Sequence, residues 1–422
     1  MSRLPVADAS CPPDPPPPAS RPWPRVATAL THRDFRVLWA GACVSTIGTW
    51  MQKVAQSWLV LTLTGSALYL GLDAFLGELP ILLFTLIGGV IADRHDRRRL
   101  LIGSQYVQMA TAFALMALVL ADVVRIWHVL ALSFLAGTAQ AFGGPAYQSL
   151  IPQLVTKDHL PNAIALNSIQ FNIARILGPL LAGATLAALG SAACFGLNGL
   201  SFLVVIVALM SLHVAHQAPA SRQPLLEEMR GGLRYVRNER AIVALTVLAF
   251  LSTFLGQPLL TFLPIFAQKI FGGGAGEYSR MMAASGGGAV MGALVVAWLG
   301  RFSHMGRALL VVHAGFGLVV VAFALSRTLW VSYALLFVGG ATTIIVLSMI
   351  TSLVQLIAPN EMRGRVMSIY MMAFRGGMPL GSLVSGWVAE STSAPTALVV
   401  NGVLLACVST YFLTRDTSVR QL

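Results

Sequence analysis

Charge is scarce in this 422-residue chain. Only 10% of its residues are Asp, Glu, Lys or Arg, whereas about a quarter are charged in a typical soluble protein. Hydrophobic residues make up 56% of the sequence, which is more than one water-soluble core can bury. The shortage of charge excludes a soluble globular protein and favours a protein that crosses a membrane several times.

The residue spacings of redox and metal chemistry are also missing. No CxxC pair and no HxxxH spacing occurs, so we expect no disulfide and no metal site. No nucleophile stands out with a base and an orienting group, and no phosphate-loop signature is present. We therefore expect neither an enzyme nor a bound cofactor. The four cysteines are Cys11, Cys43, Cys194 and Cys407.

Acidic residues are fewer than basic ones, 16 against 28, and the net charge is +12. Such a balance can indicate a nucleic-acid-binding protein. Here, however, the basic residues fall in short segments between apolar runs and form no single patch. The positive-inside rule of membrane proteins describes this distribution, so we expect a lipid bilayer as partner and no nucleic acid.

The start of the sequence lacks the apolar core of a signal peptide. Residues 1–25 instead hold nine of the 21 prolines. This composition predicts a disordered, polyproline-like cytoplasmic tail over residues 1–30.

Long apolar runs are what the sequence has in abundance. A membrane-spanning helix needs about 20 apolar residues, and twelve segments satisfy this requirement. The sequence thus predicts an all-α polytopic membrane protein with twelve spans. They are 37–62, 67–92, 99–121, 126–150, 161–189, 192–213, 241–266, 279–300, 306–325, 329–352, 364–389 and 394–414.

The positions of Lys and Arg predict the orientation. If both termini are cytoplasmic, 21 of the 28 basic residues lie in inside segments, four lie outside and three lie within spans. This asymmetry favours a multi-pass protein of the cytoplasmic membrane with both ends inside.

The spans divide into two halves that resemble each other. The stretch SIQFNIARILGPLL at Ser168 resembles SIYMMAFRGGMPLG at Ser368, at an offset of 200 residues. Two further matches lie upstream, SLIPQLV with SLVQLIA and RRLLI with RALLV. All three occur in the same order at similar offsets, which indicates a duplication. We expect six-helix halves at 31–213 and 241–414, related by a pseudo-two-fold repeat. An amphipathic linker at 214–240 and a cytoplasmic tail at 415–422 complete the chain.

Charge is concentrated in one short loop, GGVIADRHDRRRL, between the second and third spans. With twelve spans in two halves, this loop resembles the signature of the major facilitator superfamily of transporters. The matching residues are Gly89, Asp93, Arg94, Arg97 and Arg98. In the family pattern a glycine is usual where this chain has Asp96.

A second resemblance lies in the fifth span. Gly178, Pro179 and Gly183 in ARILGPLLAG look like the Gly-Pro motif of the superfamily's antiporters. Segments such as MQKVAQSWLVLTLTGSALYLGL are similar to the drug:proton antiporter-3 branch, which includes macrolide and enterobactin exporters. The resemblance implies export of drugs or siderophores against an inward flow of protons.

Charged residues inside spans need a reason, because each costs at least about 2.5 kcal/mol at the bilayer centre. Lys53 lies ~25 Å from Arg36 along its helix, and Glu78 lies ~22 Å from Asp93, so the two sit at similar depth. We expect an ion pair lining the cavity. It either carries a proton during transport or only holds the first two helices together.

Other polar residues within spans are candidates for substrate or proton contacts. Gln52 and Gln56 share one face with Lys53, which indicates a water-filled interior. We place Asp73 near the membrane interface, with a cavity mouth as the alternative. Arg175 and Arg375 occupy equivalent positions in the two halves. We expect them to contact an anionic substrate group, to pair with Glu78, or to bond to carbonyl groups freed by proline. Asn167 and Gln170 share a face with Arg175.

The loop residues also suggest a gate on the cytoplasmic side. The corresponding stretch in the second half, LGRFSHMGRALL, keeps a basic residue but has no acid, so topology alone does not explain Asp93. We expect Asp93 to latch the halves together, with Arg94, Arg97 and Arg98 nearby. It either caps the helix that starts near Arg363 or pairs with Arg363 or Arg365.

The sequence therefore favours a monomeric secondary transporter that exports small amphipathic molecules by alternating access, with protons as the coupling ion. Two alternatives remain open. One is an importer or symporter of a small metabolite, and the other is a membrane scaffold or sensor that transports nothing.

Overall fold

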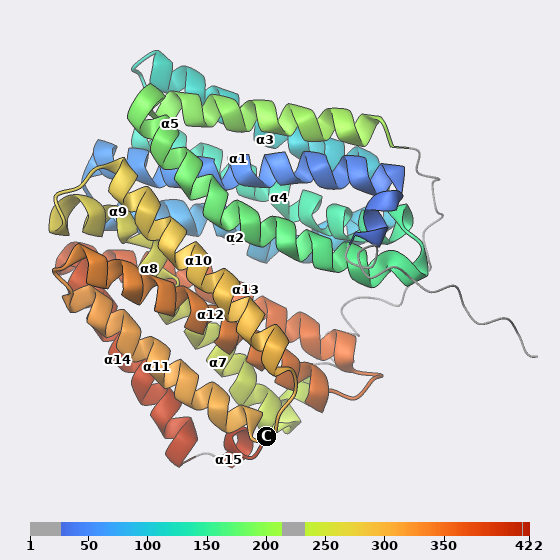
Figure 1. Ribbon diagram of the computed structural model, residues 1–422, viewed down its shortest axis with the longest axis vertical. Coiled ribbons are helices and arrows are strands. Elements are labelled where there is room, and N and C mark those ends of the chain that lie inside the picture. Colours follow the sequence, from blue (N-terminus) through green and yellow to red (C-terminus); the bar gives the residue numbers. More distant parts are fainter. Residues whose placement is uncertain (1–26, 213–232, 416) are drawn as a thin grey trace, which may run out of the picture.

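The computed structural model describes residues 27–212, 233–415 and 417–422, and within these ranges every regular element is helical (Figure 1). Most of the expected tail at 1–30 and most of the linker at 214–240 lie outside the described residues. The side chains of Asp93 and Arg94 lie outside them as well, so the structure does not test the proposed latch.

Five long helices form the first group. Gly65 ends the first of them in the left-handed conformation, at φ 62°, and the side chain of Ser66 caps the second. Asp96 caps the third, where its carboxylate accepts hydrogen bonds from the backbone N–H groups of Arg98 and Arg99. The helices of the first group are α1 (Arg33–Thr64), α2 (Ala67–Arg94), α3 (Arg97–Leu120), α4 (Ile126–Leu154) and α5 (Leu160–Met210), with short turns η2 (Thr28–Thr31) and η3 (Lys157–His159).

The 51-residue α5 contains a sharp break at Gly190. Gly190 has φ 78°, a conformation that glycine adopts at little cost and that interrupts a helix. The break falls between the spans expected at 161–189 and 192–213, so α5 holds two helical segments.

The remaining helices form the second group. Its first segment is interrupted at Pro258 and Pro264, which each lack a backbone N–H group, and ends in a π-helical turn. The helices of the second group are α7 (Arg240–Gly256), α8 (Pro258–Thr261), α9 (Leu263–Ile265), η4 (Phe266–Ile270), α10 (Ala275–Leu299), α11 (Met305–Leu325), α12 (Leu329–Ile357), α13 (Arg363–Ser391), α14 (Ala394–Thr414) and α15 (Thr417–Arg420).

Nine helical segments of the described chain are long and apolar enough to cross a membrane. One of them, Lys157–Met210, is long enough to do so twice. Two further long helices, α1 and α13, are not among the nine. Both carry charged residues in mid-helix, Lys53 and Arg375, together with serine and threonine side chains that lower their hydropathy.

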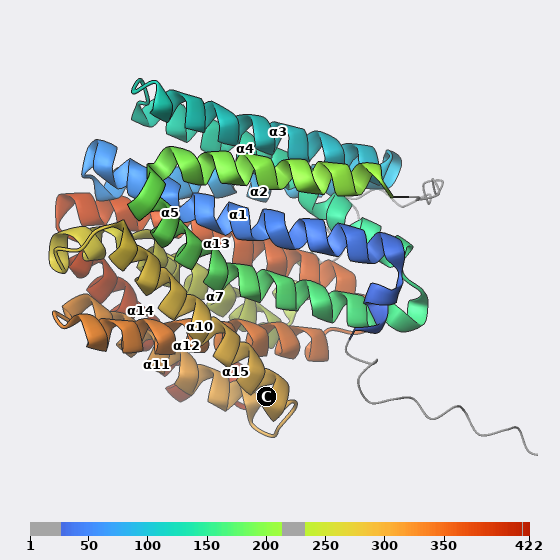
Figure 2. The ribbon, with the colours of Figure 1, turned by 45° about the horizontal axis from the view of Figure 1, so that its top comes forward.

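The two groups meet along two seams (Figures 1 and 2). In one seam α2 packs against α13, and in the other α5 packs against α10. Glycines allow the close approach in both. A Cβ atom on Gly71 would lie 2.3 Å from the carbonyl oxygen of Ser382, and one on Gly183 would lie 2.7 Å from Cβ of Ser279.

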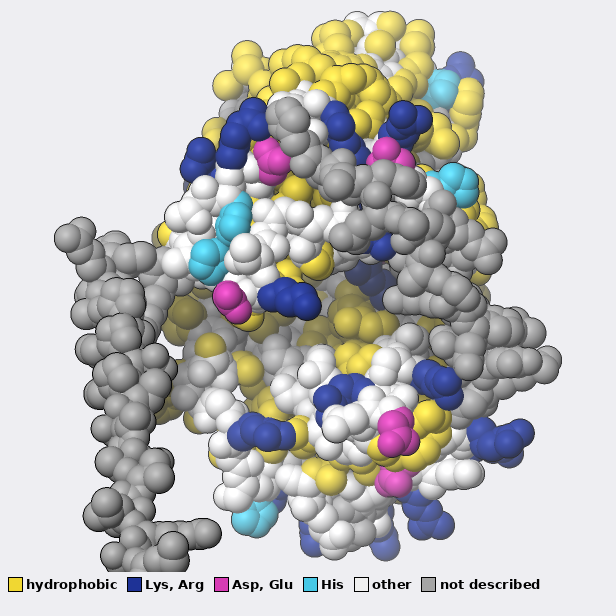
Figure 3. Space-filling model, turned by 90° about the vertical axis from the view of Figure 1, so that its right-hand side faces the viewer, with side chains coloured by type: hydrophobic (Ala, Val, Ile, Leu, Met, Phe, Trp, Pro, Cys, Tyr) yellow, Lys and Arg dark blue, Asp and Glu magenta, His cyan; other side chains and the backbone are white. Residues whose placement is uncertain are grey.

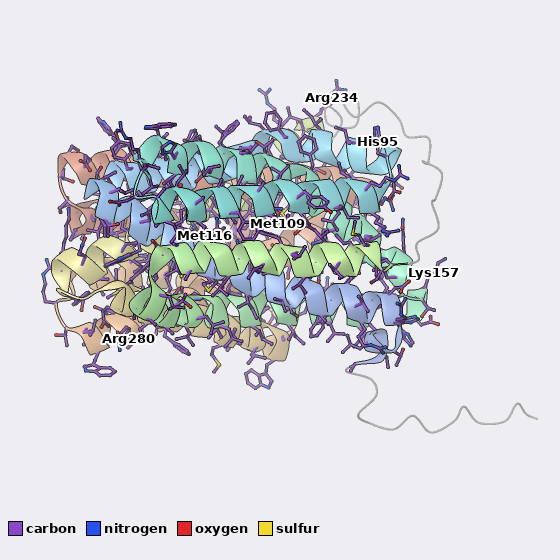
Figure 4. The ribbon with its side chains drawn as sticks, turned by 90° about the horizontal axis from the view of Figure 1, so that it is seen from above. His95, Met109, Met116, Lys157, Arg234 and Arg280 are labelled. Carbon is purple, nitrogen blue, oxygen red and sulfur yellow. The ribbon has the colours of Figure 1, made fainter. Side chains whose placement is uncertain are left out.

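The groups separate toward one end of the bundle. Figure 4 places His95, Lys157 and Arg234 at this end, which we call the basic end, and Arg280 at the other, which we call the closed end. Viewed from the basic end, the surface is hollowed between the two groups and is rimmed by Lys and Arg side chains (Figure 3).

Candidate functional site

The expected contact between Lys53 and Glu78 is present. Lys53 Nζ on α1 lies 3.5 Å from Glu78 Oε1 on α2, and the side chains are 57% and 27% exposed. Glu78 falls on the helical face shared by Gly71 and Leu82, which is the face that α2 presents to α13. An ion pair with this much exposure contributes at most about 1 kcal/mol, so it can break and re-form easily. Its role in proton coupling stays a prediction.

Trp50 gathers two cations around one aromatic ring. Lys53 Nζ lies 5.6 Å from the centre of the ring, and Arg175 Cζ on α5 lies 5.9 Å from it. Phe171, one turn before Arg175, meets the same ring edge-on at 5.8 Å. Cations at this distance interact with the negative face of an aromatic ring. We refer to Lys53, Trp50, Phe171 and Arg175 as the Trp50 cluster.

The antiporter-like motif of α5 lies against this cluster. A Cβ atom on Gly178 would lie 2.4 Å from Cβ of Trp50 and 3.0 Å from the carbonyl oxygen of Ile47. Gly178 is therefore required for α1 to approach α5 at the level of Trp50. Pro179 is buried beside it, and Gly183 makes the α10 contact one turn further on.

The two arginines at equivalent positions lie where the seams are still closed. A Cβ atom on Gly286 of α10 would lie 2.7 Å from the carbonyl oxygen of Arg175. Gly376 follows Arg375 on α13, and a Cβ atom on Gly376 would lie 3.6 Å from the side chain of Leu82 on α2. Arg175 is half-buried and Arg375 is exposed. Both arginines thus lie at the seams between the two groups.

The remaining polar residues of α1 do not face open space. Gln52 accepts a 2.6 Å hydrogen bond from Asn198 in the second segment of α5. Gln56 donates to both carboxylate oxygens of Asp73, at 2.9 and 3.0 Å, and to the hydroxyl of Ser133. On this face Lys53 is exposed, whereas Gln52 and Gln56 hydrogen-bond to neighbouring helices, and the water-filled interior stays a prediction.

Asp73 differs from its expected interfacial position. Its side chain is 8% exposed and also accepts a 2.5 Å hydrogen bond from Ser133 on α4. Three helices therefore meet at this carboxylate. Sequence position misled here, because Asp73 is close to the start of α2 but points inward.

Asn167 and Gln170 have partners within the first group. Asn167 accepts a 2.7 Å hydrogen bond from the hydroxyl of Tyr147 on α4. Gln170 donates to the hydroxyl of Thr46 on α1 at 2.9 Å, and its buried side-chain oxygen has no partner. The structure does not bring either residue into contact with Arg175.

The arginines expected at a gate bind within their own groups. Arg97 donates to the carbonyl oxygen of Ser149, and Arg98 donates to those of Leu209 and Met210. In the second group, Arg363 donates to the carbonyl oxygen of Gln355 and Arg365 to the sulfur of Met362. These described contacts tie helices together inside a group and leave the basic end open.

A set of contacts that the sequence did not reveal joins the groups at the closed end. Glu390 Oε2 at the end of α13 accepts hydrogen bonds from the Ser66 hydroxyl at 2.8 Å and from the backbone N–H groups of Ala67 and Leu68 at 3.0 and 3.3 Å. Lys269 Nζ donates to the carbonyl oxygen of Gly65 at 2.7 Å. We call these contacts the Glu390 clasp.

The clasp sits at the rim of the bundle, since Glu390 follows the span expected at 364–389. The Ser66 hydroxyl, the two backbone N–H groups and the charge of Lys269 hold the pKa of Glu390 below its ordinary value, although its partial burial acts in the opposite direction. Glu390 is therefore a carboxylate at neutral pH. Two sequence signals could have revealed this contact. Glu390 is an acid directly after an expected span, and Lys269 is one of only four basic residues expected on the outer side.

Within the described ranges, no three His, Cys, Asp or Glu side chains come close enough together to hold a metal ion. The loop residue that departs from the family pattern also has a simple explanation. Asp96 has φ −63°, a value open to any residue, so this turn has no need of glycine.

Known proteins share the fold, and some align with most of the chain at low sequence identity. A bacterial homologue of the human lysosomal transporter Spinster, solved inward-facing and unoccupied, superposes with a TM-score of 0.72 over 94% of this chain and 98% of that one, at 13% identity. That likeness shows the fold alone.

Two curated relatives match over nearly their whole length. The macrolide efflux protein A of Streptococcus pyogenes is 24% identical over 383 residues, covering 89% of this chain and 94% of the relative. The staphyloferrin A transporter of Staphylococcus aureus is 26% identical over 387 residues, with the same coverage. The model of the family described as transmembrane secretion effectors matches residues 26–420. The chain thus belongs to this family of major facilitator transporters and is a multi-pass membrane protein that moves small molecules.

Proposed function

We propose that this protein exports small amphipathic compounds in exchange for protons, by alternating access. The observation that carries the proposal is the asymmetry of the bundle. The two groups are hollowed apart at the basic end, whereas the Glu390 clasp and the glycine contacts of both seams join them at the other. A bundle that is open on one side and held by a few polar contacts on the other can exchange the two states.

The complete architecture that we propose has twelve spans in two repeated halves. The two segments of α5, together with α1 and α13, bring the nine apolar segments to twelve. The halves are 31–213 and 241–414, connected by 214–240 and flanked by tails at 1–30 and 415–422. Each half packs as a unit, and the chain works as a monomer because the hollow lies between its own two groups.

We assign the basic end to the cytoplasm, in the inner membrane, with both termini inside. The support is the excess of Lys and Arg at this end, as the positive-inside rule requires. Substrate would then enter from the cytoplasm and leave where the clasp opens. The printed names of the relatives, a macrolide efflux protein and a siderophore transporter, support export of small compounds of these kinds.

Lys53 and Glu78 are the proposed coupling pair. A proton on Glu78 removes the negative partner of Lys53, and the weak, half-exposed pair opens at little cost. Because Glu78 lies on the α2 face that meets α13, a change in its charge acts at the seam between the groups. Coupling through Glu78 therefore links protonation to the relative position of the two groups.

Transport by purified protein in liposomes tests the function. The dyes fluorescein and rhodamine 123 serve as amphipathic probes, and dye movement is followed with and without a pH gradient. We expect movement of dye against the direction of the proton gradient, and loss of the gradient's effect in Glu78→Gln. Glu277→Gln, which removes an acid that pairs only within α10, is the matched control.

Three outcomes would contradict the proposal in different ways. Dye movement in the same direction as protons indicates a symporter. An undiminished effect of the gradient in Glu78→Gln ends the coupling role of that residue. If the protein moves neither dye under any gradient, the export of amphipathic compounds is wrong.

A further inference from the structure

The positive charge of the Trp50 cluster is not balanced by the carboxylates of the described residues. Lys53 is paired with Glu78, but among the described residues no carboxylate lies within 4 Å of Arg175. The other carboxylate at this end of α2, Asp73, is already engaged by Gln56 and Ser133. A guanidinium inside a membrane protein is costly unless it meets a partner. Arg175 therefore needs a negative charge that the described chain does not supply.

The position of Arg175 makes this charge accessible to a ligand. Arg175 lies at the α5–α10 seam, where a Cβ atom on Gly286 would come within 2.7 Å of its carbonyl oxygen, and its side chain is only half-buried. Arg375, exposed on the opposite group, adds a further cation at the corresponding place on α13. Among the described residues, the cations are Lys53, Arg175 and Arg375 and the carboxylate is Glu78. The site is therefore positively charged overall.

The aromatic residues define the rest of the ligand. Phe171 stands edge-on to the Trp50 ring, and Gly178 fixes Trp50 against α5, so the ring has a set position. A flat aromatic group can stack on such rings. A guanidinium binds a carboxylate through two parallel hydrogen bonds, because both groups are planar.

We infer that the transported compounds carry a carboxylate next to a flat aromatic body, with the carboxylate held by Arg175 and the ring by Trp50 and Phe171. This inference rests on the proposed transport function and specifies its substrate class. Arg375 contributes to the same field from the second group. A cationic compound of equal size is disfavoured, because it would add to the unbalanced positive charge.

Two dyes with one ring system test the inference. Fluorescein carries a carboxylate and is anionic at neutral pH, whereas in rhodamine 123 the carboxylate is esterified and the molecule is cationic. Their binding to the full-length protein in a neutral detergent is measured by fluorescence anisotropy. We expect fluorescein to bind more tightly than rhodamine 123.

Variants then locate the charge and the ring. Arg175→Gln is expected to weaken fluorescein binding at least about tenfold, since a hydrogen bond to a charged group is lost. Arg175→Lys should retain part of the affinity, and neither variant should weaken rhodamine 123 binding. Trp50→Leu should weaken fluorescein binding more than Trp50→Phe, which keeps a ring.

Arg280→Gln is the matched control, because Arg280 lies at the closed end and pairs with Glu277 on its own helix. Its fluorescein affinity should equal that of the natural chain. Preference of the natural chain for rhodamine 123, absence of fluorescein binding, or unchanged fluorescein affinity in Arg175→Gln would each overturn the inference. If Arg175→Gln does not elute as a single species, Arg175→Lys and Trp50→Leu decide.

The two proposals fail separately. If rhodamine 123 is transported and fluorescein is neither bound nor moved, the protein is an exporter and the substrate class is wrong. If fluorescein binds through Arg175 but no dye is moved under any gradient, the anion site stands and the transport function is wrong.

Discussion

The hydroxyl of Ser66 donates a 2.8 Å hydrogen bond to Oε2 of Glu390, which is 324 residues further along the chain. Ser66 caps the start of α2 in the first group, and Glu390 lies at the end of α13 in the second. The carboxylate also faces the partial positive charge of the α2 N-terminus. One side chain thus joins the two groups at the closed end and gives the proposed transport cycle a defined contact to break.

Removing this carboxylate should open the closed end. Glu390→Ala loses three hydrogen bonds between the groups, and we expect the ratio of open to closed molecules to rise by roughly tenfold. Spin labels at Ala121→Cys and Thr328→Cys, two exposed loop positions at this end, report the distance by pulsed electron resonance. The natural cysteines are replaced by serine in this background.

The control for this experiment is Glu277→Ala. Glu277 lies at the start of α10, and its described ion pair is with Arg280 on the same helix. The label distances should not change in this variant. An equal change in both variants, or none in Glu390→Ala, would show that the clasp does not hold the groups together.

The closed state should weaken in acid. The pKa of Glu390 is lowered in the closed state, so its contribution is fully present above the ordinary pKa of a glutamate, about 4.3. The contribution is lost as the pH falls through the lowered value. Titration of the same spin-labelled protein should therefore show opening only below roughly pH 4. Glu390→Ala should remove this dependence, and opening near neutral pH would contradict the pKa direction.

Gly178→Ala should impair transport much more than an ordinary glycine substitution. The added Cβ would lie 2.4 Å from Cβ of Trp50, so α1 and α5 must move apart and the Trp50 cluster must shift. We expect at least a tenfold loss of dye transport, or about 1.4 kcal/mol. In Gly103→Ala on α3 the new Cβ would meet nothing within 4 Å, and activity should be retained. Similar rates in the two variants would remove the motif from the mechanism.

Asp73→Ala should lower stability, because it removes the carboxylate that accepts hydrogen bonds from Gln56 and from the buried hydroxyl of Ser133. The expected cost is about 1–3 kcal/mol, measured as a lower Tm of the detergent-solubilised protein. Asp73→Asn keeps an acceptor and should lose less. Transport at a normal rate by Asp73→Asn would confirm a structural role, whereas loss of proton coupling would assign Asp73 to the mechanism.

Much of the helical architecture follows from the sequence. The apolar run expected at 394–414 coincides with α14, and that at 306–325 begins one residue after α11 does. The pairing of Lys53 with Glu78 followed from simple depth arithmetic, because α1 begins and α2 ends at a charged segment that fixes its position in the membrane.

Direction around the helix axis was harder to predict. Gln56 and Lys53 share one face, yet Gln56 turns to Asp73 and Ser133 whereas Lys53 stays exposed. Only the neighbouring helices decide this difference, and a single sequence does not show which helices are neighbours. The same reason concealed the Trp50 cluster, since Trp50 and Arg175 come together only when Gly178 lets α1 and α5 touch.

The first group's share of the Glu390 clasp consists largely of peptide groups. Glu390 accepts hydrogen bonds from the backbone N–H groups of Ala67 and Leu68, and Lys269 donates one to the carbonyl oxygen of Gly65. Any amino acid except proline would offer the same N–H group at position 67 or 68. Substitutions in this stretch can therefore accumulate without loss of closure, provided that α1 still ends and α2 still begins at the same place. Substitution of Glu390 or Lys269 alone can therefore change the strength of the contact at the closed end, without a matching substitution in the first group.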